Sequence, residues 1–327
     1  MIKGNNPLVS IIIPFYNAAE FLQEAIDSIS CIDCDYEAIF VDDGSKDSGA
    51  QIVKSNIQIN PQIKLIHQEN QGANRARETG VKYATGRWIT FLDADDLLLP
   101  EFAEFINSNC NNFNGDIIVS YPIHLKGTQQ NQIVSSTEYC NLILREALHT
   151  GPISKLFRRE IFNGFIFNIP NHIVSAEDYL MNVRLALSTQ SNVLISNIQF
   201  YNIRTGRNPS SAMKTFKSNW SYWEEWDELL NKSFTKEQRE RHLLSLTDRR
   251  LKFWHTYCRK QWKLSRKYYD CQYFKLLKQD IEKSGYKVDF FTKLNMSLRN
   301  PVLRMFSDII TRIYGVGCKY CNKLCQK

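Results

Sequence analysis

The sequence predicts an α/β fold with a mostly parallel central sheet, followed by an α-helical C-terminal region. Over residues 9–121, short β-branched and aromatic runs alternate with segments of helical periodicity, which is the pattern of sheets built from β-α-β units. From residue 214 onward, large apolar residues recur every three or four positions, which is typical of helices. We therefore divide the chain into a sheet-containing domain, residues 1–213, and a helical extension, residues 214–327.

Five strands can be assigned in order along the first domain. The first, "LVSIIIP" at 8–14, is a continuous β-branched run, as expected for a strand buried on both faces of a sheet. A helix is expected between each pair of successive strands. The other four strands are assigned to "YEAIFV" at 36–41, "IKLIH" at 63–67, "WITFL" at 88–92 and "DIIVSY" at 116–121.

The helices between these strands have recognisable ends. Asn17 offers an N-cap for the first helix, and Glu20 stands in the capping-box position three residues later. A short second helix is expected at about 47–55, and a third that ends near Gly86. The fourth is expected to begin at Pro100, because proline is favoured in the first helical turn.

Polar, turn-forming residues follow three of the strands where they end. In open, mostly parallel sheets, ligands bind beyond the carboxyl ends of the strands. The carboxylates of these segments are therefore expected along one edge of the sheet, which makes that edge the candidate binding site. The segments are Pro14-x-Tyr16-Asn17, Asp42-Asp43-Gly44-Ser45 and Asp93-Ala94-Asp95-Asp96.

Three carboxylates, those of Asp93, Asp95 and Asp96, follow the fourth strand together. They repel one another, so a positive group is expected to hold them. Asp93 and Asp95 can reach one point if the turn curls, and carboxylate oxygens suit Mg²⁺ or Mn²⁺, which in turn favour the phosphates of a nucleotide. The alternative is that Asp95 or Asp96 only caps the next helix.

Two other enzyme classes with similar motifs are disfavoured. In haloacid-dehalogenase-type phosphatases the nucleophilic Asp of the DxD triplet follows the first strand of the domain, whereas here the triplet follows the fourth. A dinucleotide-dependent dehydrogenase is disfavoured because the GxG of this chain, Gly315-x-Gly317, lies near its end.

The composition favours a soluble globular protein. Hydrophobic residues make up 43% and charged residues 23%, and no apolar run has the roughly 18 to 20 residues of a membrane-spanning helix. Because the amino terminus lacks the features of a signal peptide, we expect a cytoplasmic location. The nine cysteines are then expected to be free thiols, although Cys318, Cys321 and Cys325 leave a zinc site open.

The charge is divided unevenly between the two parts. Residues 1–213 carry 16 Lys and Arg against 22 Asp and Glu, a net charge of −6, whereas residues 214–327 carry 25 against 12, a net charge of +13. The simplest interpretation is a helical extension with a solvated basic face. We expect no binding to nucleic acid, because no recognised motif accompanies the charge.

The last segment predicts a basic amphipathic helix, capped by Asn300 and beginning at Pro301. Such a helix can lie in the surface of an anionic membrane, here the inner face of the cell membrane. The alternative is that its stripe packs on the protein itself or on a second subunit of a homo-oligomer. The apolar stripe consists of Val302, Phe306, Ile309, Ile313 and Val316, with Arg304 and Arg312 beside it.

Seven segments over about residues 7–212 resemble, in their order and spacing, the inverting family 2 glycosyltransferases, which have the Rossmann-like GT-A fold. Each segment alone is modest support, and the series makes coincidence improbable. They are "VSIIIPFYN" (9–17), "EAIFVDDGSKD" (37–47), "NQGANRARETG" (70–80), "WITFLDADD" (88–96), "SKLFRREIF" (154–162), "AEDYLMNVRLAL" (176–187) and "YNIRTGRNPSSA" (201–212).

The resemblance implies a nucleotide pocket formed by the first three segments. Pro14 and Tyr16 would border the uridine, with Asn17 beside them, and Asp43 would accept the N3 proton of uracil. Asn70 matches a family position that approaches the base.

It also implies a place for the diphosphate and its metal. Arg77 matches a position near the phosphates, and Asp93 and Ala94 would lie near the ribose. Asp95, with Asp93 as a second ligand, would bind the Mn²⁺ or Mg²⁺ that bridges the two phosphates.

Glu177-Asp178 stands at the expected start of a helix, where acidic residues are favoured by the helix dipole alone. In the family this pair carries the catalytic base, so the resemblance implies that Asp178 deprotonates the acceptor hydroxyl while Glu177 positions it. Arg204, with Ser210 and Ser211, resembles the loop that closes over the donor phosphates, and Arg207 competes with Arg204 for that role.

The implied reaction is transfer of a sugar from a UDP-sugar, or another nucleotide-sugar, to a saccharide or lipid-linked saccharide acceptor, in cell-surface polysaccharide biosynthesis. The alternative is a catalytically inactive GT-A-fold protein that binds nucleotide-sugars or serves as a scaffold in a glycan-assembly complex. The presence of Asp43, Asp95 and Asp178 together favours the enzyme.

Overall fold

The computed structural model of the chain describes residues 6–120, 130–204, 219–260 and 271–288, with 293, 296 and 297, except for the side chains of 255–260. The chain forms two compact units, Met1–Phe234 and Thr235–Lys327. Several features predicted from the sequence lie outside the described residues: the domain boundary at 213/214, Ser210 and Ser211, Arg207, and the tail helix from Pro301 with the cysteines after it.

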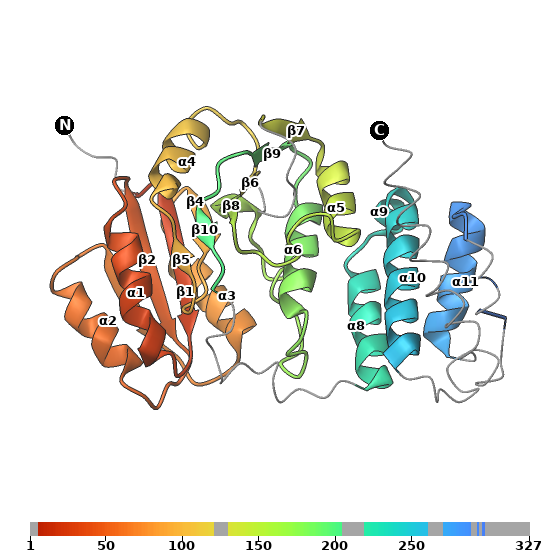
Figure 1. Cartoon of the computed structure of the whole chain (residues 1–327), viewed down its shortest axis with the longest axis horizontal. Coiled ribbons are helices and arrows are strands. Elements are labelled where there is room, and N and C mark those ends of the chain that lie inside the picture. Colours follow the sequence, from red (N-terminus) through yellow and green to blue (C-terminus); the bar gives the residue numbers. More distant parts are fainter. Residues whose placement is uncertain are drawn as a thin grey trace. The chain divides into compact units, whose positions relative to one another are not determined.

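The first unit is built around an eight-stranded sheet (Figure 1). Its strands are β1 (Val9–Phe15), β2 (Tyr36–Asp42), β3 (Ile63–His67), β4 (Trp88–Phe91), β6 (Ile117–Ser120), β7 (Gln132–Val134), β8 (Lys155–Arg158) and β9 (Val193–Ser196). Their order is β3-β2-β1-β4-β8-β6-β9-β7, with β1 to β4 parallel and with β8 and β7 antiparallel to their neighbours. The mostly parallel sheet predicted from the sequence is therefore confirmed. A separate ribbon pairs β5 (Leu97–Leu98) with β10 (Tyr201–Asn202).

Helices cover both faces of the sheet. Ile11 and Ile13 of β1 belong to a core cluster with apolar residues of α1 and α4, whereas Ile12 lies so close to α3 that a Cβ on Gly80 would overlap it. Since successive residues of a strand point to opposite faces, α1 and α4 lie on one face and α3 on the other. The described helices of this unit are α1 (Ala19–Ser30), α2 (Gly49–Ile57), α3 (Ala73–Tyr83), α4 (Glu101–Asn109), α5 (Ser136–Leu144), α6 (Glu177–Leu187) and α8 (Trp220–Lys232), and Arg159–Ile161 forms a 3₁₀ turn.

The start of α1 differs from the predicted capping box. Asn17 has a positive φ of 48°, and its side-chain oxygen accepts from the backbone N–H of Lys46 at 2.8 Å rather than from α1. Asp47 caps the helix instead, because its Oδ2 accepts from the N–H of Ala19, the first residue of α1, at 2.8 Å. Its Oδ1 accepts from the N–H of Gly49, the first residue of α2, at 3.0 Å. The cap prediction was wrong because the turn after β1 is tied to the turn after β2.

The sheet order places a topological switch point at β1. The chain adds β2 and β3 on one side of β1 and then returns to place β4 on the other side. The carboxyl ends of β1 and β4 are therefore neighbours at the switch point, which is where ligands bind in sheets of this class.

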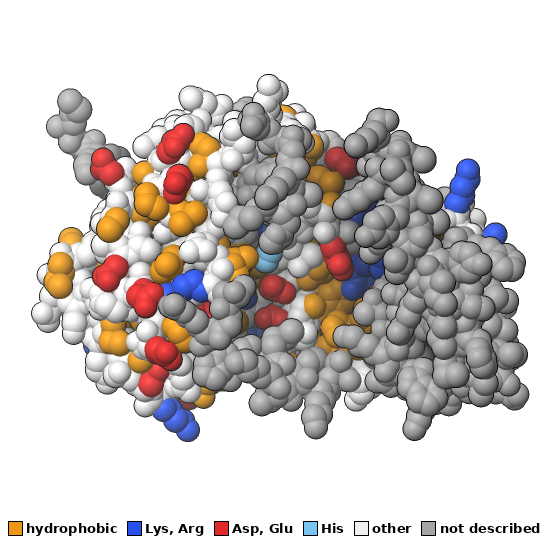
Figure 2. Space-filling view, viewed as in Figure 1, with side chains coloured by type: hydrophobic (Ala, Val, Ile, Leu, Met, Phe, Trp, Pro, Cys, Tyr) orange, Lys and Arg blue, Asp and Glu red, His pale blue; other side chains and the backbone are white. Residues whose placement is uncertain are grey.

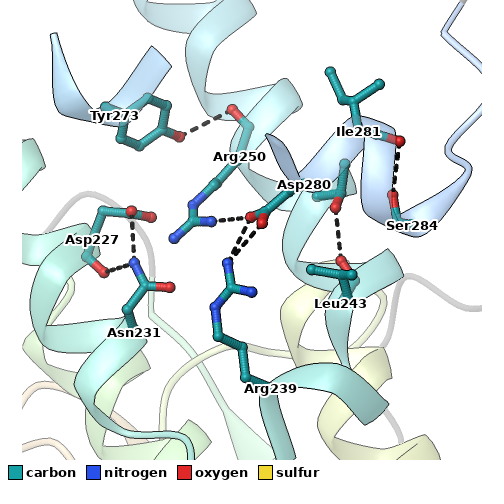
Figure 3. A network of polar contacts seen from close by, with 10 residues as sticks. Asp227, Asn231, Arg239, Leu243, Arg250, Tyr273, Asp280, Ile281 and Ser284 are labelled. Atoms are coloured by element: carbon teal, nitrogen blue, oxygen red, sulfur yellow. Dashed lines mark hydrogen bonds and ion pairs between the residues drawn. The ribbon is translucent and has the colours of Figure 1, made fainter. Parts of the chain in front are cut away.

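The second unit is helical, as predicted for the C-terminal region, with α9 (Lys236–Arg241), α10 (Leu243–Lys260) and α11 (Gln272–Ser284). Figure 3 shows its buried ion cluster, in which Asp280 of α11 accepts from Nη2 of Arg239 at 2.7 Å and also pairs with the guanidinium of Arg250. The phenol of Tyr273 donates to the backbone carbonyl of Arg250 at 3.0 Å. Buried charges are stable only when paired in this way.

Two of the broader expectations can be compared with the described residues. Within the described ranges, no helix combines the length and apolar character needed to cross a membrane. The five described cysteines, Cys31, Cys34, Cys110, Cys140 and Cys271, are free thiols, as predicted.

Candidate active site

The loops after β1, β2 and β4 meet at the carboxyl edge of the sheet, as the positions of their polar residues predicted. Figure 2 shows acidic and basic side chains together near the middle of the face, over the region between α3 and α6 in Figure 1, with hydrophobic side chains around them. The hydrogen-bonded strands fix the positions at which these loops begin, and the polar groups belong to the residues directly after the strands.

Asp43 follows β2 and is buried. Its Oδ1 accepts from the side chain of Gln68 at 2.7 Å and from the N–H of Gln71 at 2.9 Å, while Oδ2 accepts from the N–H of Gly72 at 2.8 Å. A carboxylate has about four acceptor positions, so Oδ2 retains one for a further donor. Asp43 therefore fixes the loop before α3.

Asp93 follows β4 and forms an ion pair with Arg77 of α3, with 2.8 Å between Oδ1 and Nη2. Burial alone would lower the pKa of Arg77, but the charges of Asp93, Glu177 and Asp178 raise it overall. One buried guanidinium thus lies in the field of carboxylates from β4 and from α6. It supplies part of the positive charge that the acidic triplet required.

Asp96 is buried and does not cap a helix, since α4 begins only at Glu101. Its Oδ2 accepts from the phenol of Tyr201 at 2.8 Å, and its Oδ1 accepts from the N–H of Arg204 at 2.8 Å. Burial raises the pKa of Asp96 to about 6, with the charges of Asp93 and Asp95 adding to the rise and these hydrogen bonds opposing it. Asp96 joins the β4 loop to the β10 loop.

Arg204 lies beside the acidic triplet with its guanidinium almost fully buried. Its Nε donates to the backbone carbonyl of Asp95, and its Nη1 pairs with Glu24 of α1. In this arrangement the guanidinium holds the β4 loop against α1. Its expected contact with donor phosphates stays a prediction.

Glu177 and Asp178 form the first turn of α6, directly after Ala176. Ala176 has a positive φ of 60°, a conformation that costs free energy for a residue with a side chain. Burial raises the pKa of Glu177, and the neighbouring Asp178 raises it further, while Arg77 lowers it. The two carboxylates therefore share the electrostatic environment of Asp93 and Arg77.

Helix α8 contacts the backbone of Ser175 and Ala176, the two residues that precede these carboxylates in the chain. The phenol of Tyr222 accepts from the N–H of Ser175 at 2.8 Å and donates to the carbonyl of Ser175 at 2.9 Å. The indole of Trp226 donates to the carbonyl of Ala176 at 3.0 Å and packs on Tyr179, with ring centroids 5.4 Å apart. These four bonding and packing contacts maintain the left-handed turn at Ala176.

Sequence reasoning missed a second segment beside Asp178, residues 149–153, and the lysine that holds it. Lys155 at the start of β8 is fully buried, and its ammonium donates to the carbonyls of His149, Gly151 and Ile153 at 2.9, 2.6 and 3.2 Å. Burial lowers the pKa of Lys155 to about 7, and Asp178 opposes the shift. The buried lysine within the "SKLF" motif was the available signal, since a buried ammonium needs several acceptors.

The remaining predicted residues lie around this edge. Pro14 is buried within β1, and Tyr16 after it is 42% exposed, as a surface for a ligand's base would be. Asn70 is exposed on the loop fixed by Asp43, and Ala94 is buried between the aspartates. The structure thus gathers Arg77, Asp93, Glu177 and Asp178 in one electrostatic cluster, and Asp43 lies on a separate loop.

The expected cation would need ligands in addition to the carboxylates of the described residues. Within the described residues, no group of three His, Cys, Asp or Glu side chains could hold a metal ion. Asp93 and Asp95 are both near enough to Asp96 to raise its pKa. One or two carboxylates completed by substrate phosphates form an ordinary Mg²⁺ ligand set, so these residues fit a cation that binds together with a diphosphate.

Comparison with known proteins identifies the family of the chain. Residues 10–166 match the family model described as glycosyl transferase family 2. An uncharacterized glycosyltransferase of Haemophilus influenzae is 30% identical over 224 residues, which are 67% of this chain and 87% of that protein. The chain belongs to glycosyl transferase family 2.

More distant relatives of this family 2 member include a protein of known structure. The poly(ribitol-phosphate) β-N-acetylglucosaminyltransferase TarS of Staphylococcus aureus is 24% identical over 211 residues, which are 62% of this chain and 37% of TarS. The crystal structure of TarS 1–349 in complex with UDP-GlcNAc matches with a TM-score of 0.56 at 19% identity, covering 74% of this chain and 80% of that one. This likeness shows the GT-A fold.

Proposed function

We propose that this family 2 member is an inverting glycosyltransferase that moves a sugar from a UDP-sugar to a saccharide or lipid-linked saccharide acceptor of a cell-surface polysaccharide. The observation that carries the proposal is that one guanidinium, that of Arg77, interacts electrostatically with Asp93 after β4 and with the Glu177-Asp178 pair on α6. Asp93 is expected to contact the sugar donor, and Glu177 and Asp178 are expected to contact the acceptor.

The choice of a uridine nucleotide is supported by two features. Oδ2 of Asp43 has an acceptor position left for the imide N–H of uracil. Tyr16, the residue that follows β1, has an exposed ring on which the base could lie. The fold resembles that of TarS 1–349, which was crystallised with UDP-GlcNAc. UDP-GlcNAc is therefore the first donor to test.

In the proposed reaction Asp178 removes the proton from the acceptor hydroxyl as that oxygen attacks the anomeric carbon, opposite the departing diphosphate. Arg77 keeps Asp93 in place and balances the charge of the acidic cluster. Asp95 and Asp93 would hold a divalent cation, which supplies charge stabilisation for the leaving diphosphate when bound. α8 and Lys155 fix the backbone on either side of Asp178.

The test of the proposal is Asp178→Asn in the full chain. We expect UDP affinity to be unchanged and sugar transfer to fall by roughly 10²- to 10⁴-fold, because the amide cannot accept the proton. Transfer is measured with UDP-GlcNAc, other UDP-sugars and a panel of free and p-nitrophenyl saccharides, and UDP binding by calorimetry. Asp116→Asn, outside the cluster, is the control with the same chemical change.

Near-normal turnover by Asp178→Asn would move the base elsewhere, with Glu177 as the first candidate. If the wild-type chain bound UDP but neither transferred nor hydrolysed any nucleotide-sugar, the alternative of a non-catalytic binding or scaffold protein would be favoured.

A second experiment tests the proposed metal. Asp95→Ala should abolish the increase in UDP affinity that Mn²⁺ or Mg²⁺ gives, because the cation loses an oxygen ligand and the diphosphate faces uncompensated charge. The affinity measured in EDTA should be similar for both proteins. Equal enhancement by Mn²⁺ in the variant and in the wild type would contradict the assignment of Asp95.

A further inference from the structure

The segment that Lys155 holds, residues 149–153, lies directly against the carboxylate of Asp178. A Cβ built on Gly151 would lie 2.7 Å from Oδ2 of Asp178 and 3.2 Å from Cε1 of His149. These two atoms are therefore no more than 5.9 Å apart (2.7 Å added to 3.2 Å). The imidazole of His149 is thus a neighbour of the proposed base.

The hydrogen bond to its ring fixes the tautomer of His149. The backbone N–H of Gly151 points at Nδ1 of His149, with 3.2 Å between the nitrogens. A backbone N–H can only donate, so Nδ1 is the acceptor and the proton of the neutral ring lies on Nε2. Within the part of the chain that the structure describes, Nε2–H has no hydrogen-bond partner.

Burial favours the neutral form of His149. Burial lowers its pKa and the ammonium of Lys155 lowers it further, while the carboxylates of Asp178 and Asp93 raise it. The net shift is downward, so the ring is neutral near pH 7. Because Nδ1 is occupied and Nε2 carries the proton, His149 cannot itself take a proton from the acceptor.

We propose that His149 is an acceptor-binding residue, whose Nε2–H donates to a saccharide hydroxyl or ring oxygen beside the hydroxyl that Asp178 deprotonates. The inference rests on the proposed function, since it needs a saccharide next to Asp178. The imidazole whose Cε1 lies within 5.9 Å of Oδ2 of Asp178 carries this donor on Nε2, which is bonded to Cε1, so the donor is near enough to orient the attacking sugar. Lys155 and Gly151 fix the imidazole in place. Such a contact selects acceptors by the position of one oxygen.

Two substitutions of His149 distinguish a role in acceptor binding from a role in folding. In His149→Asn the amide oxygen replaces Nδ1 as acceptor for Gly151 N–H, but nothing replaces Nε2–H. In His149→Gln the amide N–H₂ reaches about the position of Nε2. His172→Asn, at an exposed histidine that pairs with Glu225, is the matched control.

The experiment measures kcat/KM for the acceptor, hydrolysis of UDP-GlcNAc without acceptor, and UDP affinity, using the saccharide of the panel that the wild type glycosylates best. For His149→Asn we expect kcat/KM for the acceptor to fall by roughly three- to tenfold, the effect of one neutral hydrogen bond. Hydrolysis and UDP affinity should stay within about twofold of wild type. His149→Gln should recover part of the loss, and His172→Asn should behave as wild type.

Unchanged acceptor kinetics in His149→Asn would overturn the inference while leaving the proposed function intact. Equal losses of hydrolysis and transfer in both variants would also overturn it, because the imidazole would then act on the donor or on the fold. A wild-type chain that transfers no sugar would instead remove the proposed function on which it rests.

Discussion

Gly151 shows how closely one backbone position can determine the place of a side chain, here that of Asp178, the proposed base. Its N–H donates to His149, its carbonyl accepts from Lys155, and its missing side chain leaves room for Oδ2 of Asp178. The glycine is required here by space rather than by a left-handed backbone, because its φ is not among the positive ones.

We predict that Gly151→Ala abolishes most sugar transfer without unfolding the protein. The new methyl group would lie 2.7 Å from Oδ2 of Asp178, so the carboxylate must move from its place. A misplacement of about 1 Å in a reacting group can cost about 10²-fold in rate. UDP affinity measured by calorimetry should be unchanged, since the displaced group lies on α6.

Gly164→Ala is the matched control for this prediction. A Cβ there would meet no atom within 4 Å, so activity and melting temperature should remain at wild-type values. Equal transfer rates in Gly151→Ala and Gly164→Ala would contradict the proposed position of Asp178.

At the scale of elements, α8 connects a later part of the sequence to the turn that precedes the proposed base, Asp178. Its aromatic residues donate to and accept from the backbone of Ser175 and Ala176, some fifty positions earlier in the chain. The left-handed turn at Ala176 persists because these contacts oppose its cost. The helix thereby sets the direction in which α6 begins.

We predict that Trp226→Phe lowers transfer by roughly three- to tenfold with little change in UDP affinity. The phenyl ring can still pack on Tyr179, but the hydrogen bond to the carbonyl of Ala176 is lost, which costs about 0.5–1.5 kcal/mol. Steady-state kinetics and thermal unfolding would measure both effects.

Glu225→Ala serves as the comparison on the same helix. It removes only an exposed pair with His172, and such pairs contribute about 0–1 kcal/mol. Should Trp226→Phe and Glu225→Ala have the same kinetics, α8 would not position the base.

The sequence was sufficient for the elements whose signals are local. The strands β1 to β4 and the acidic residues beyond them are visible as apolar runs followed by polar turns, and the start of α6 follows from Glu177-Asp178. Partners distant in the chain were not visible. Neither Asp47 as the cap of α1, nor Lys155 beneath Asp178, nor Trp226 on Ala176 produces a local pattern. The antiparallel β8 was missed because its four residues, KLFR, hold only two apolar side chains between two basic ones, which is too short a pattern to indicate a strand.

At the scale of the molecule, the two units differ in how they are stabilised. The first has an extended apolar core on both faces of its sheet, whereas the second buries a carboxylate between two arginines. Asp280 and Arg250 are each at most 2% exposed at their side chains, so neither charge is relieved by water.

We predict that Asp280→Ala destabilises the second unit by about 3–5 kcal/mol, because it removes the carboxylate that neutralises the buried guanidinium of Arg250. UDP binding should survive at low temperature, since every described residue of the candidate site lies in the first unit. Calorimetric unfolding and UDP titration of the same sample would measure both. Glu237→Ala, which removes an exposed pair with Arg241, is the control.

The position of β8 in the sheet has a consequence for synthesis on the ribosome. The parallel set β3-β2-β1-β4 is complete once Phe91 has emerged, but β4 then has an open edge until β8 pairs with it through Trp88 and Ile89. At roughly 5 to 20 residues per second, the ribosome needs several seconds to add the intervening residues. During that interval the nascent chain presents an unpaired strand edge, which is where chaperones or neighbouring nascent chains would attach.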